Sequence, residues 1–227
     1  MENTSLSPTE QNYVKAIFKV QEMTGAKAVS TNDIAERLLT QPATVTDMIK
    51  RLAEKKLVTY KKYYGVHLTA KGEKIALDII RKHRLWEVFL VNKLHFKWDK
   101  VHVIAEQLEH IESDELINRL DEFLGKPEFD PHGDPIPDKH GKMSQADSVP
   151  LSTLGKKKSC TFCGVANHED KFLQYLDSLK LHLGTTIYVE SVNEYDSSYK
   201  VKINNKRSEF FSSQIASCIL VKPVYGK

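Results

Sequence analysis

The segment from His83 to His110 concentrates imidazole and carboxylate side chains at helical spacing. A helix over residues 70–94 places His83 and Glu87 one turn apart on one face. A second helix over residues 99–111 carries an apolar face and, beside it, a face with His102, Glu106, Glu109 and His110. Burying such groups without partners is costly, so the pattern indicates a divalent cation as their partner. Nitrogen and oxygen ligands without thiolate favour manganese, iron(II) or zinc over copper(I).

A solvated, charged helix surface can produce the same spacing. A single histidine–glutamate pair is more often part of such a surface than of a metal site. Six ligand-type residues on two helices strengthen the metal hypothesis. From the residues alone, both interpretations stay open.

The composition is that of a soluble protein, with 227 residues of which 41% are hydrophobic, enough for one large domain or two to three small ones. Residues 1–72 hold 11 basic and 7 acidic side chains, whereas residues 73–142 hold 11 and 15. This asymmetry fits a nucleic-acid-binding first domain and a cation-binding second one. No apolar run approaches the roughly 20 residues of a membrane span, so we predict a cytoplasmic protein without membrane association. Three cysteines do not form a disulfide framework.

The first third of the chain has the pattern of a winged helix-turn-helix domain. Ser7 and Glu10 form a capping box at the start of a helix over residues 8–23, which Gly25 ends. The elements that follow are predicted as helices over residues 33–39 and 43–55 and strands over residues 57–62 and 66–68. This order is typical of DNA-binding domains, although small helical domains that bind only protein can share it.

The outward-facing residues at the start of the third helix are small or able to form hydrogen bonds, as contact with base edges requires. Basic side chains on the hairpin suit phosphates. We therefore expect double-stranded DNA as a partner. The predicted contacts are Thr31, Gln41, Ala43, Thr44, Thr46, Asp47, Lys50 and Arg51 on the helical part, and Lys61 and Lys62 on the wing.

A further helix over residues 113–124 ends before Gly125 and Pro127, a C-cap followed by a helix stop. Wide apolar helix faces without a sheet of their own predict a homodimer, and two-fold symmetric proteins bind palindromic operators. The residues expected on this dimer surface are Ile104, Leu108, Leu116, Leu120 and Phe123. From Phe129 the run Asp-Pro-His-Gly-Asp-Pro-Ile-Pro cannot continue a helix.

The C-terminal part changes to the alternating pattern of strands. Strands are predicted over residues 186–192, 199–203 and 217–221, with one helix over residues 168–179. A small β-barrel is the expected form. Cys160 and Cys163, with His168 nearby, show only three of the four ligands of a zinc site, so free thiols are the alternative.

The predicted fold class is mainly α with a small all-β C-terminal domain. It consists of a winged helix-turn-helix, a helical dimerisation domain and an SH3-like barrel of the FeoA type. The predicted boundaries are residues 1–72 for DNA binding, 73–137 for dimerisation and metal binding, 138–149 for a linker and 150–227 for the barrel.

Several motifs together resemble the diphtheria toxin repressor and manganese transport regulator family. They include Pro-Thr-Glu-Gln-Asn-Tyr-Val-Lys-Ala-Ile-Phe, Asp-Ile-Ala-Glu-Arg-Leu, Leu-Thr-Ala-Lys-Gly, Val-His-(x3)-Glu-(x2)-Glu-His and Gly-Asp-Pro-Ile-Pro. The match is dense over residues 7–137 and loose over the barrel. The resemblance implies a dimeric, metal-activated repressor with two Mn²⁺ or Fe²⁺ sites per subunit and no small organic substrate.

The resemblance also implies a division of the ligands. His83, Glu87 and His102 would form one site, and Glu106, Glu109 and His110 the other. A residue of the first helix completes the second site in this family, and Asn12 stands at that position, where family members have aspartate or methionine. Lys15 replaces the glutamate that manganese regulators use one turn later. From the barrel, His168 aligns with a ligand position and Lys171 with another that a lysine does not suit.

The resemblance implies that metal acts as a corepressor, through relief of carboxylate repulsion. Two unit charges about 4 Å apart cost roughly 4 kcal/mol at an effective dielectric of about 20, so we expect Glu87, Glu106 and Glu109 to repel one another without metal. A dimetal carboxylate enzyme is one alternative, but it needs Glu-x-x-His on two helices, and Leu90 stands three residues after Glu87. A metal-independent winged-helix regulator is the other.

Overall fold

The computed structural model describes residues 6–61, 64–145 and 147–224. Two compact units can be distinguished. The first unit comprises residues 1–83, 106–114 and 137–142, and the second comprises residues 84–105, 115–136 and 143–227. In the described ranges, no helix is both long and apolar enough to cross a membrane.

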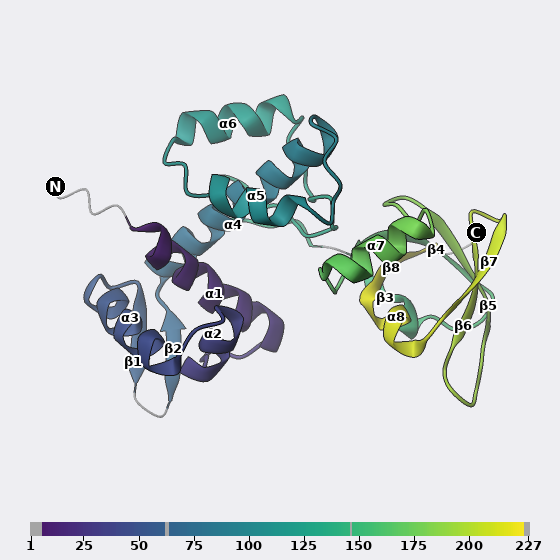
Figure 1. Ribbon diagram of the computed structural model, residues 1–227, viewed down its shortest axis with the longest axis horizontal. Helices are drawn as coiled ribbons and strands as arrows, with labels where there is room; N and C mark the ends of the chain where they lie inside the picture. The colour runs from purple at the N-terminus through teal and green to yellow at the C-terminus, as the bar shows by residue number, and fades with distance from the viewer. Residues whose placement is uncertain (1–5, 62–63, 146, 225–227) are drawn as a thin grey trace. The chain divides into compact units, whose positions relative to one another are not determined.

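The first unit holds the winged helix-turn-helix (Figure 1). Its elements are α1 (Pro8–Thr24), α2 (Thr31–Arg37), α3 (Pro42–Glu54), β1 (Val58–Lys61) and β2 (Gly65–Leu68). β1 and β2 pair as an antiparallel hairpin. Buried residues from all three helices, such as Ile17, Ile34 and Ile49, form one core with Val66 of the hairpin. This arrangement leaves the start of α3 exposed to solvent.

The ends of these helices follow from their capping residues. The Ser7 hydroxyl accepts from the backbone N–H of Glu10 and the Glu10 carboxylate accepts from that of Ser7, which confirms the predicted capping box. Ser30 and Asp33 form a second box. The second helix therefore begins at Thr31, and the predicted start at Asp33 was wrong because Asp33 was taken as the first helical residue rather than as the third.

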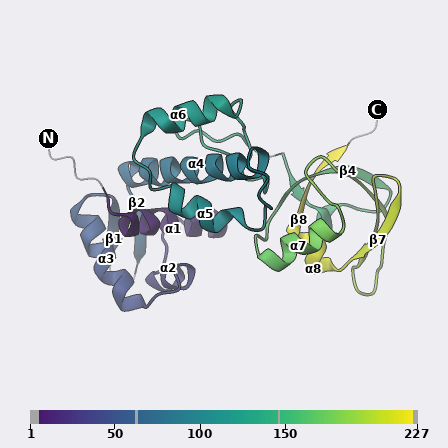
Figure 2. The ribbon, with the colours of Figure 1, turned by 45° about the horizontal axis from the view of Figure 1, so that its top comes forward.

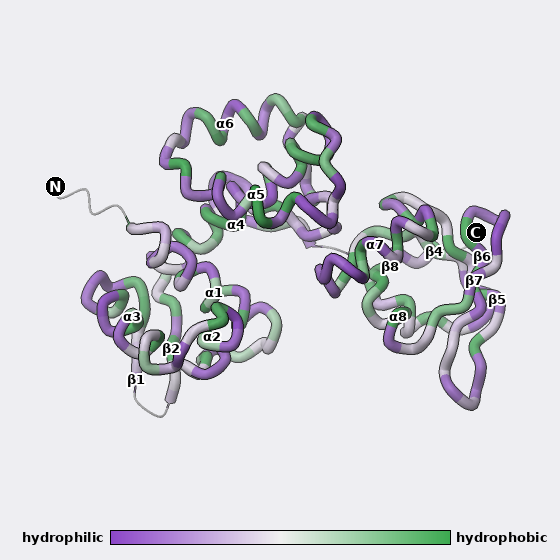
Figure 3. The backbone as a smooth tube through the Cα atoms, viewed as in Figure 1, coloured by the Kyte–Doolittle hydropathy of each residue, from purple (hydrophilic) through white to green (hydrophobic). Residues whose placement is uncertain are grey.

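The long helix α4 (Ala70–Asn92) continues from the first unit into the second. It is followed by α5 (Val101–Leu108) and α6 (Asp114–Phe123). α6 runs alongside the C-terminal half of α4, where the rings of Phe89 and Phe123 lie 6.4 Å apart (Figure 2). Hydrophobic and hydrophilic residues alternate along α6 (Figure 3), as expected of a helix with one buried face.

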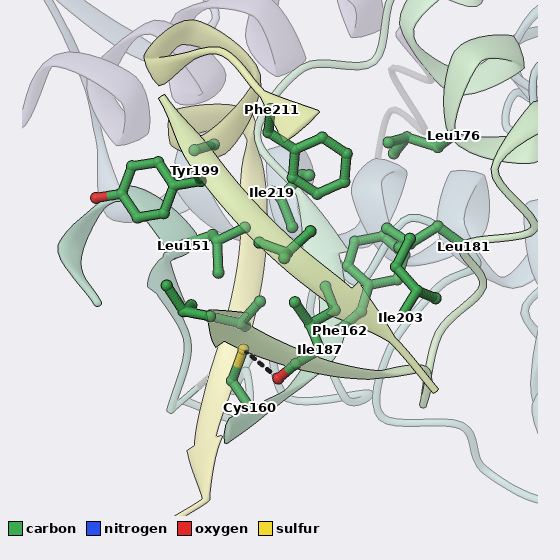
Figure 4. Close-up of a cluster of buried hydrophobic side chains, with 14 of the residues drawn as sticks. Leu151, Cys160, Phe162, Leu176, Leu181, Ile187, Tyr199, Ile203, Phe211 and Ile219 are labelled. Carbon is green, nitrogen blue, oxygen red and sulfur yellow. Dashed lines mark hydrogen bonds between the residues drawn. The ribbon is translucent and has the colours of Figure 1, made fainter. Parts of the chain in front are cut away.

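The C-terminal part of the second unit is an antiparallel six-stranded sheet with the order β3-β8-β4-β5-β6-β7. The elements are β3 (Val149–Pro150), the 3-10 turn η1 (Leu151–Thr153), β4 (Lys158–Val165), α7 (Asp170–Ser178), β5 (Thr186–Val192), β6 (Tyr199–Ile203), β7 (Arg207–Phe211), α8 (Ser213–Cys218) and β8 (Ile219–Val224). The sheet encloses a core that includes Phe162, Phe211 and Leu176 (Figure 4). The predicted fold class, mainly α with a small all-β domain, is confirmed.

Three strands of this sheet, β3, β4 and β7, were not predicted, and β8 was placed wrongly. β4 contains Gly164 and a shift of register between Phe162 and Gly164, which interrupts the alternating pattern. The predicted strand over residues 217–221 begins instead at Ile219, because Ser212 caps the short helix α8. The Cys160 thiol donates to the Ile187 carbonyl, 3.4 Å away, and the three cysteines are free.

The loop after α6 packs its backbone directly on β4. The Val165 N–H donates to the His132 carbonyl at 2.9 Å, and Gly133 adopts φ of +90°. A Cβ at Gly133 would lie 2.2 Å from the Cys163 carbonyl oxygen and 2.4 Å from the Gly164 Cα. No side chain can be accommodated there without moving the loop away from the strand.

We expect Gly133→Ala to lower the free energy of unfolding by about 2 kcal/mol or more, because it adds backbone strain to a clash. Denaturant unfolding followed by circular dichroism measures the effect. Gly155→Ala is the matched control, since a Cβ at Gly155 would meet no described heavy atom within 4 Å. Equal stability of the two variants would contradict the packing of this loop on β4.

Candidate functional site

Glu87 is the centre of the first group of possible metal ligands. It lies on α4 with only 2% of its surface exposed. The Nδ1 atom of His102, on α5, is 3.5 Å from one of its oxygens. His83 precedes Glu87 by one turn on the same helix, and ligand atoms of the three residues lie within 4.8 Å of one another. The structure thus brings together the three residues predicted for this site.

A second group shares Glu87 and was not predicted. Asp130 and His132, from the loop after α6, place a carboxylate oxygen and an imidazole nitrogen within 4.8 Å of a Glu87 oxygen, and all three residues are buried. The Nδ1 atom of His132 is 3.7 Å from the second Glu87 oxygen. Asp130 accepts the backbone N–H groups of His132 and Asp134 at 2.8 and 3.0 Å. These hydrogen bonds hold the Asp130 carboxylate beside Glu87.

The surroundings of His132 determine which of its nitrogens can bind an ion. Its Nε2 atom is 2.9 Å from the Trp98 carbonyl, which can only accept, so Nε2 carries the hydrogen. In the neutral ring the lone pair is then on Nδ1, which faces Glu87. A hydrogen bond of this kind on the other ring nitrogen is the usual support of a metal-binding histidine.

The charges in this group are strongly coupled. Burial lowers the pKa of His132, but the hydrogen bond to Glu87 and the charges of Glu87 and Asp130 outweigh it and raise the pKa to about 9. Burial, together with the charges of Glu87 and Asp134, raises the pKa of Asp130 to about 7. Arg84 compensates this negative charge, with its guanidinium 3.0 Å from Asp134 and 3.8 Å from Asp130. Cation binding would therefore release a proton from His132.

Glu109, on the turn after α5, is the centre of the second cluster. It is fully buried. The Lys15 ammonium, from α1, lies 2.5 Å from its Oε1 atom and 3.6 Å from Glu106. His83 Nδ1 lies 2.6 Å from its Oε2 atom. We had expected these carboxylates to lack partners in the metal-free protein. This part of the prediction was wrong, because Glu109 and Glu87 both have cationic or imidazole partners within the protein.

His110 is prepared as a ligand by α1. Gln11 donates through its amide nitrogen to the Leu6 carbonyl, so its oxygen faces His110 Nδ1 at 2.7 Å and accepts that hydrogen. The His110 Nε2 atom, which then carries the lone pair, lies 3.9 Å from the Oε1 atom of Glu109. Burial lowers the pKa of His110, which keeps the ring neutral. The Gln11 contact was not predicted, because a single glutamine beside Asn12 gives no signal in the sequence.

Asn12 and His168 were the two predicted ligands outside the segment from His83 to His110. The Asn12 side-chain oxygen is buried and has no hydrogen-bond partner among the described residues, which fits an oxygen that binds a cation. His168 has its Nε2 atom 3.8 Å from Asp134, and its ring is 5.3 Å from that of His132. Lys171 is exposed.

Most residues of the predicted DNA-contacting face are exposed. Ala43, Thr44, Asp47, Lys50 and Arg51 on α3 are exposed, as is Gln41 at its N-cap, whereas Thr31 and Thr46 are half-buried. The Thr46 hydroxyl donates to the Pro42 carbonyl, and Lys50 pairs with Asp47 at 3.1 Å. Lys61 is exposed and lies over the Tyr64 ring at 4.2 Å. Lys62 lies outside the described residues.

Comparison with known proteins explains the combination of a winged helix-turn-helix with clusters of metal-ligand residues. Residues 5–66 match the model of the iron-dependent repressor N-terminal DNA-binding domain, and residues 69–138 match that of the iron-dependent repressor metal-binding and dimerisation domain. A solved structure described as a manganese-dependent transcriptional repressor in complex with manganese is 35% identical, with a TM-score of 0.85. The match covers 95% of this chain and all of that one. The chain belongs to the family of iron- and manganese-dependent repressors.

Two relatives show both branches of this repressor family. The iron-dependent repressor IdeR of Mycobacterium leprae is 33% identical over 132 residues, 58% of this chain and 56% of that protein. The regulator MntR of Bacillus subtilis is 33% identical over 118 residues, 52% of this chain and 81% of that protein. Residues 149–223 match the FeoA domain. The chain thus aligns with little more than half the length of the mycobacterial relative.

The His132 pKa of about 9 leads to a pH dependence of stability in the metal-free protein. Because this value lies above the ordinary 6.5, the folded chain retains a proton that the unfolded chain has lost. The stabilising contribution, on the order of 3 kcal/mol, is complete below pH 6.5 and lost as pH rises through about 9. Urea unfolding in chelator at pH 7 and pH 9.5 should show this loss.

His132→Gln should remove most of the difference between the two pH values. His182→Gln is the matched control, because His182 is an exposed histidine of the same unit. A pH difference that survives in the His132 variant would show that another group is responsible.

Proposed function

We propose that this protein is a metal-activated transcriptional repressor that binds DNA with Mn²⁺ or Fe²⁺ as corepressor. The observation that supports this most directly is the contact of α1 with the ligand cluster formed by Glu106, Glu109 and His110. Gln11 contacts His110 and Lys15 contacts Glu109, while the opposite face of α1 packs in the core of the winged helix. One helix therefore belongs to both the DNA-binding core and the ligand cluster.

In this proposal, α1 transmits metal binding in the ligand cluster to the winged-helix domain. Val14, Ile17 and Val20 are buried in the winged-helix core, so α1 and α3 behave as one packed body. A bound metal would supply positive charge to Glu106, Glu109, His110 and Asn12. A ligand changes the population of a conformation only through a difference in affinity for the two states. Contacts from α1 that differ between the states provide such a difference.

The DNA partner we propose is a double-stranded, palindromic operator bound by a homodimer. The exposed apolar residues Val103, Leu116 and Phe123 support a dimer surface on α5 and α6. Leu120, which we had predicted for this surface, is buried within its own unit. Ile104 and Leu108 are half-buried. Action on DNA without a membrane-spanning helix among the described residues is consistent with the cytoplasm as the site of function.

The proposal predicts a division of roles on the DNA-binding face. Combined Lys50→Ala and Thr44→Ala should reduce affinity for the operator by about 1–3 kcal/mol per lost base contact, and should weaken discrimination between sequences. Lys61→Ala should lower affinity for all sequences and reduce the salt slope by about one. Fluorescence anisotropy across a salt series with operator and unrelated DNA measures both. Unchanged operator affinity in the double variant, with metal still bound, would show that α3 is not the recognition helix.

The choice of metal should depend on Glu106, because a carboxylate suits manganese whereas a thiolate favours softer ions. We expect Mn²⁺ and Fe²⁺ at micromolar levels to activate DNA binding, Zn²⁺ to bind but activate poorly, and Glu106→Cys to shift the response toward softer ions. Anaerobic titration of DNA binding with each metal tests this, with Glu115→Cys on α6 as control for an added thiol. Full activation by Zn²⁺ with none by Mn²⁺ would contradict the proposal, and DNA binding insensitive to chelator would favour a metal-independent regulator.

A further inference from the structure

Lys15 occupies an unusual position for a lysine on a helix. Only 16% of its side chain is exposed, and its ammonium lies between two carboxylates of the ligand cluster, 2.5 Å from Glu109 and 3.6 Å from Glu106. A dehydrated ammonium is stable only when it is paired. The pairing here is with residues that would otherwise bind a metal ion, so this lysine is a component of the cluster.

The contacts of Glu109 show what a metal ion would have to displace. Its Oε1 atom is held by Lys15 and its Oε2 atom by His83 Nδ1 at 2.6 Å, so both oxygens of this buried carboxylate are in use. A divalent ion binds a carboxylate oxygen at about 2.0–2.2 Å. An ammonium 2.5 Å from the same oxygen would then be within a few ångströms of the ion, and two cations that close repel strongly at low dielectric.

We infer that Lys15 is the resident cation of this cluster, which a metal ion must replace. The inference rests on the proposed function, since it concerns metal binding by Glu106, Glu109 and His110. In the metal-free protein Lys15 neutralises the cluster and joins α1 to the residues after α5. On metal binding it leaves Glu109, and this exchange raises the metal concentration at which the protein responds. Lys15 thereby sets sensitivity, and its positive charge disfavours a second ion in the cluster.

Three variants of the full chain test the exchange. Lys15→Met removes the charge while retaining most of the side-chain volume, and Lys15→Arg retains the charge. Lys55→Met is the matched control, because Lys55 forms another lysine–glutamate pair with α1, 2.6 Å from Glu10, away from the ligand cluster. Isothermal titration with Mn²⁺ gives affinity and stoichiometry, and thermal unfolding in chelator gives the stability of the metal-free protein.

We expect Lys15→Met to bind Mn²⁺ about tenfold more tightly at one site, since an internal competitor is lost, and to unfold at lower temperature in chelator. Lys15→Arg should stay within about threefold of the unsubstituted chain in affinity. Lys55→Met should lower the unfolding temperature in chelator without changing Mn²⁺ affinity. Addition of His110→Ala to Lys15→Met should abolish the tighter site, which assigns the gain to this cluster.

Two results would be decisive against the inference. Unchanged or weaker Mn²⁺ binding by Lys15→Met, with normal circular dichroism, would show that the lysine is only a structural ion pair; Lys15→Gln provides a second neutral variant if the methionine variant does not fold. Mn²⁺ binding that is unaffected by His110→Ala in the unsubstituted chain would instead overturn the proposed function of the cluster. The two failures are therefore distinguishable.

Discussion

The buried carboxylates of Glu87 and Glu109 impose the constraint on which the rest of this structure depends. An ionised carboxylate removed from water needs a positive or hydrogen-bonding partner, because its desolvation otherwise costs several kcal/mol. Glu109 obtains its partners from α1 and α4, through Lys15 and His83. Glu87 obtains them from α5 and the loop after α6, through His102 and His132. Segments far apart in the sequence are thus held in place by two negative charges.

Internal partners change what binding of an external cation means. If the carboxylates repelled one another, a bound metal ion would relieve this electrostatic repulsion, and its affinity would be correspondingly higher. Lys15, His83 and His132 already compensate them. With the exchange that we infer for Lys15, the free energy available for a conformational change would be the difference between two paired states. Such a difference is smaller than the full Coulombic attraction. A modest difference suits a sensor, since it keeps both states accessible over a narrow range of metal concentration.

Signals within a short stretch of sequence were sufficient to predict the bounds of elements that such a stretch determines. The Ser7 and Glu10 capping box gave the start of α1, and the alternating pattern gave β5 at Thr186–Val192 without error. The order of helices and strands in the winged helix-turn-helix was also predicted from these signals. By contrast, the run that contains Asp130 and His132 was interpreted as a helix stop and, in part, as a family motif, and neither residue was predicted as a ligand. The partner of Lys15 lies 94 residues away, so no pattern within a helix could have indicated it.

His132 connects the buried charge to the C-terminal sheet. Its ring faces Glu87, while its own carbonyl accepts the Val165 N–H of β4 and the neighbouring Gly133 lies against Gly164. Rotation of the ring toward an ion is coupled to a backbone that has no free volume on the side of β4. The same short loop also carries Asp134, which contacts His168 at 3.8 Å. The loop that places Asp130 and His132 beside Glu87 is therefore itself held by backbone contacts with β4, so the position of these buried side chains depends on the packing of the loop on the sheet.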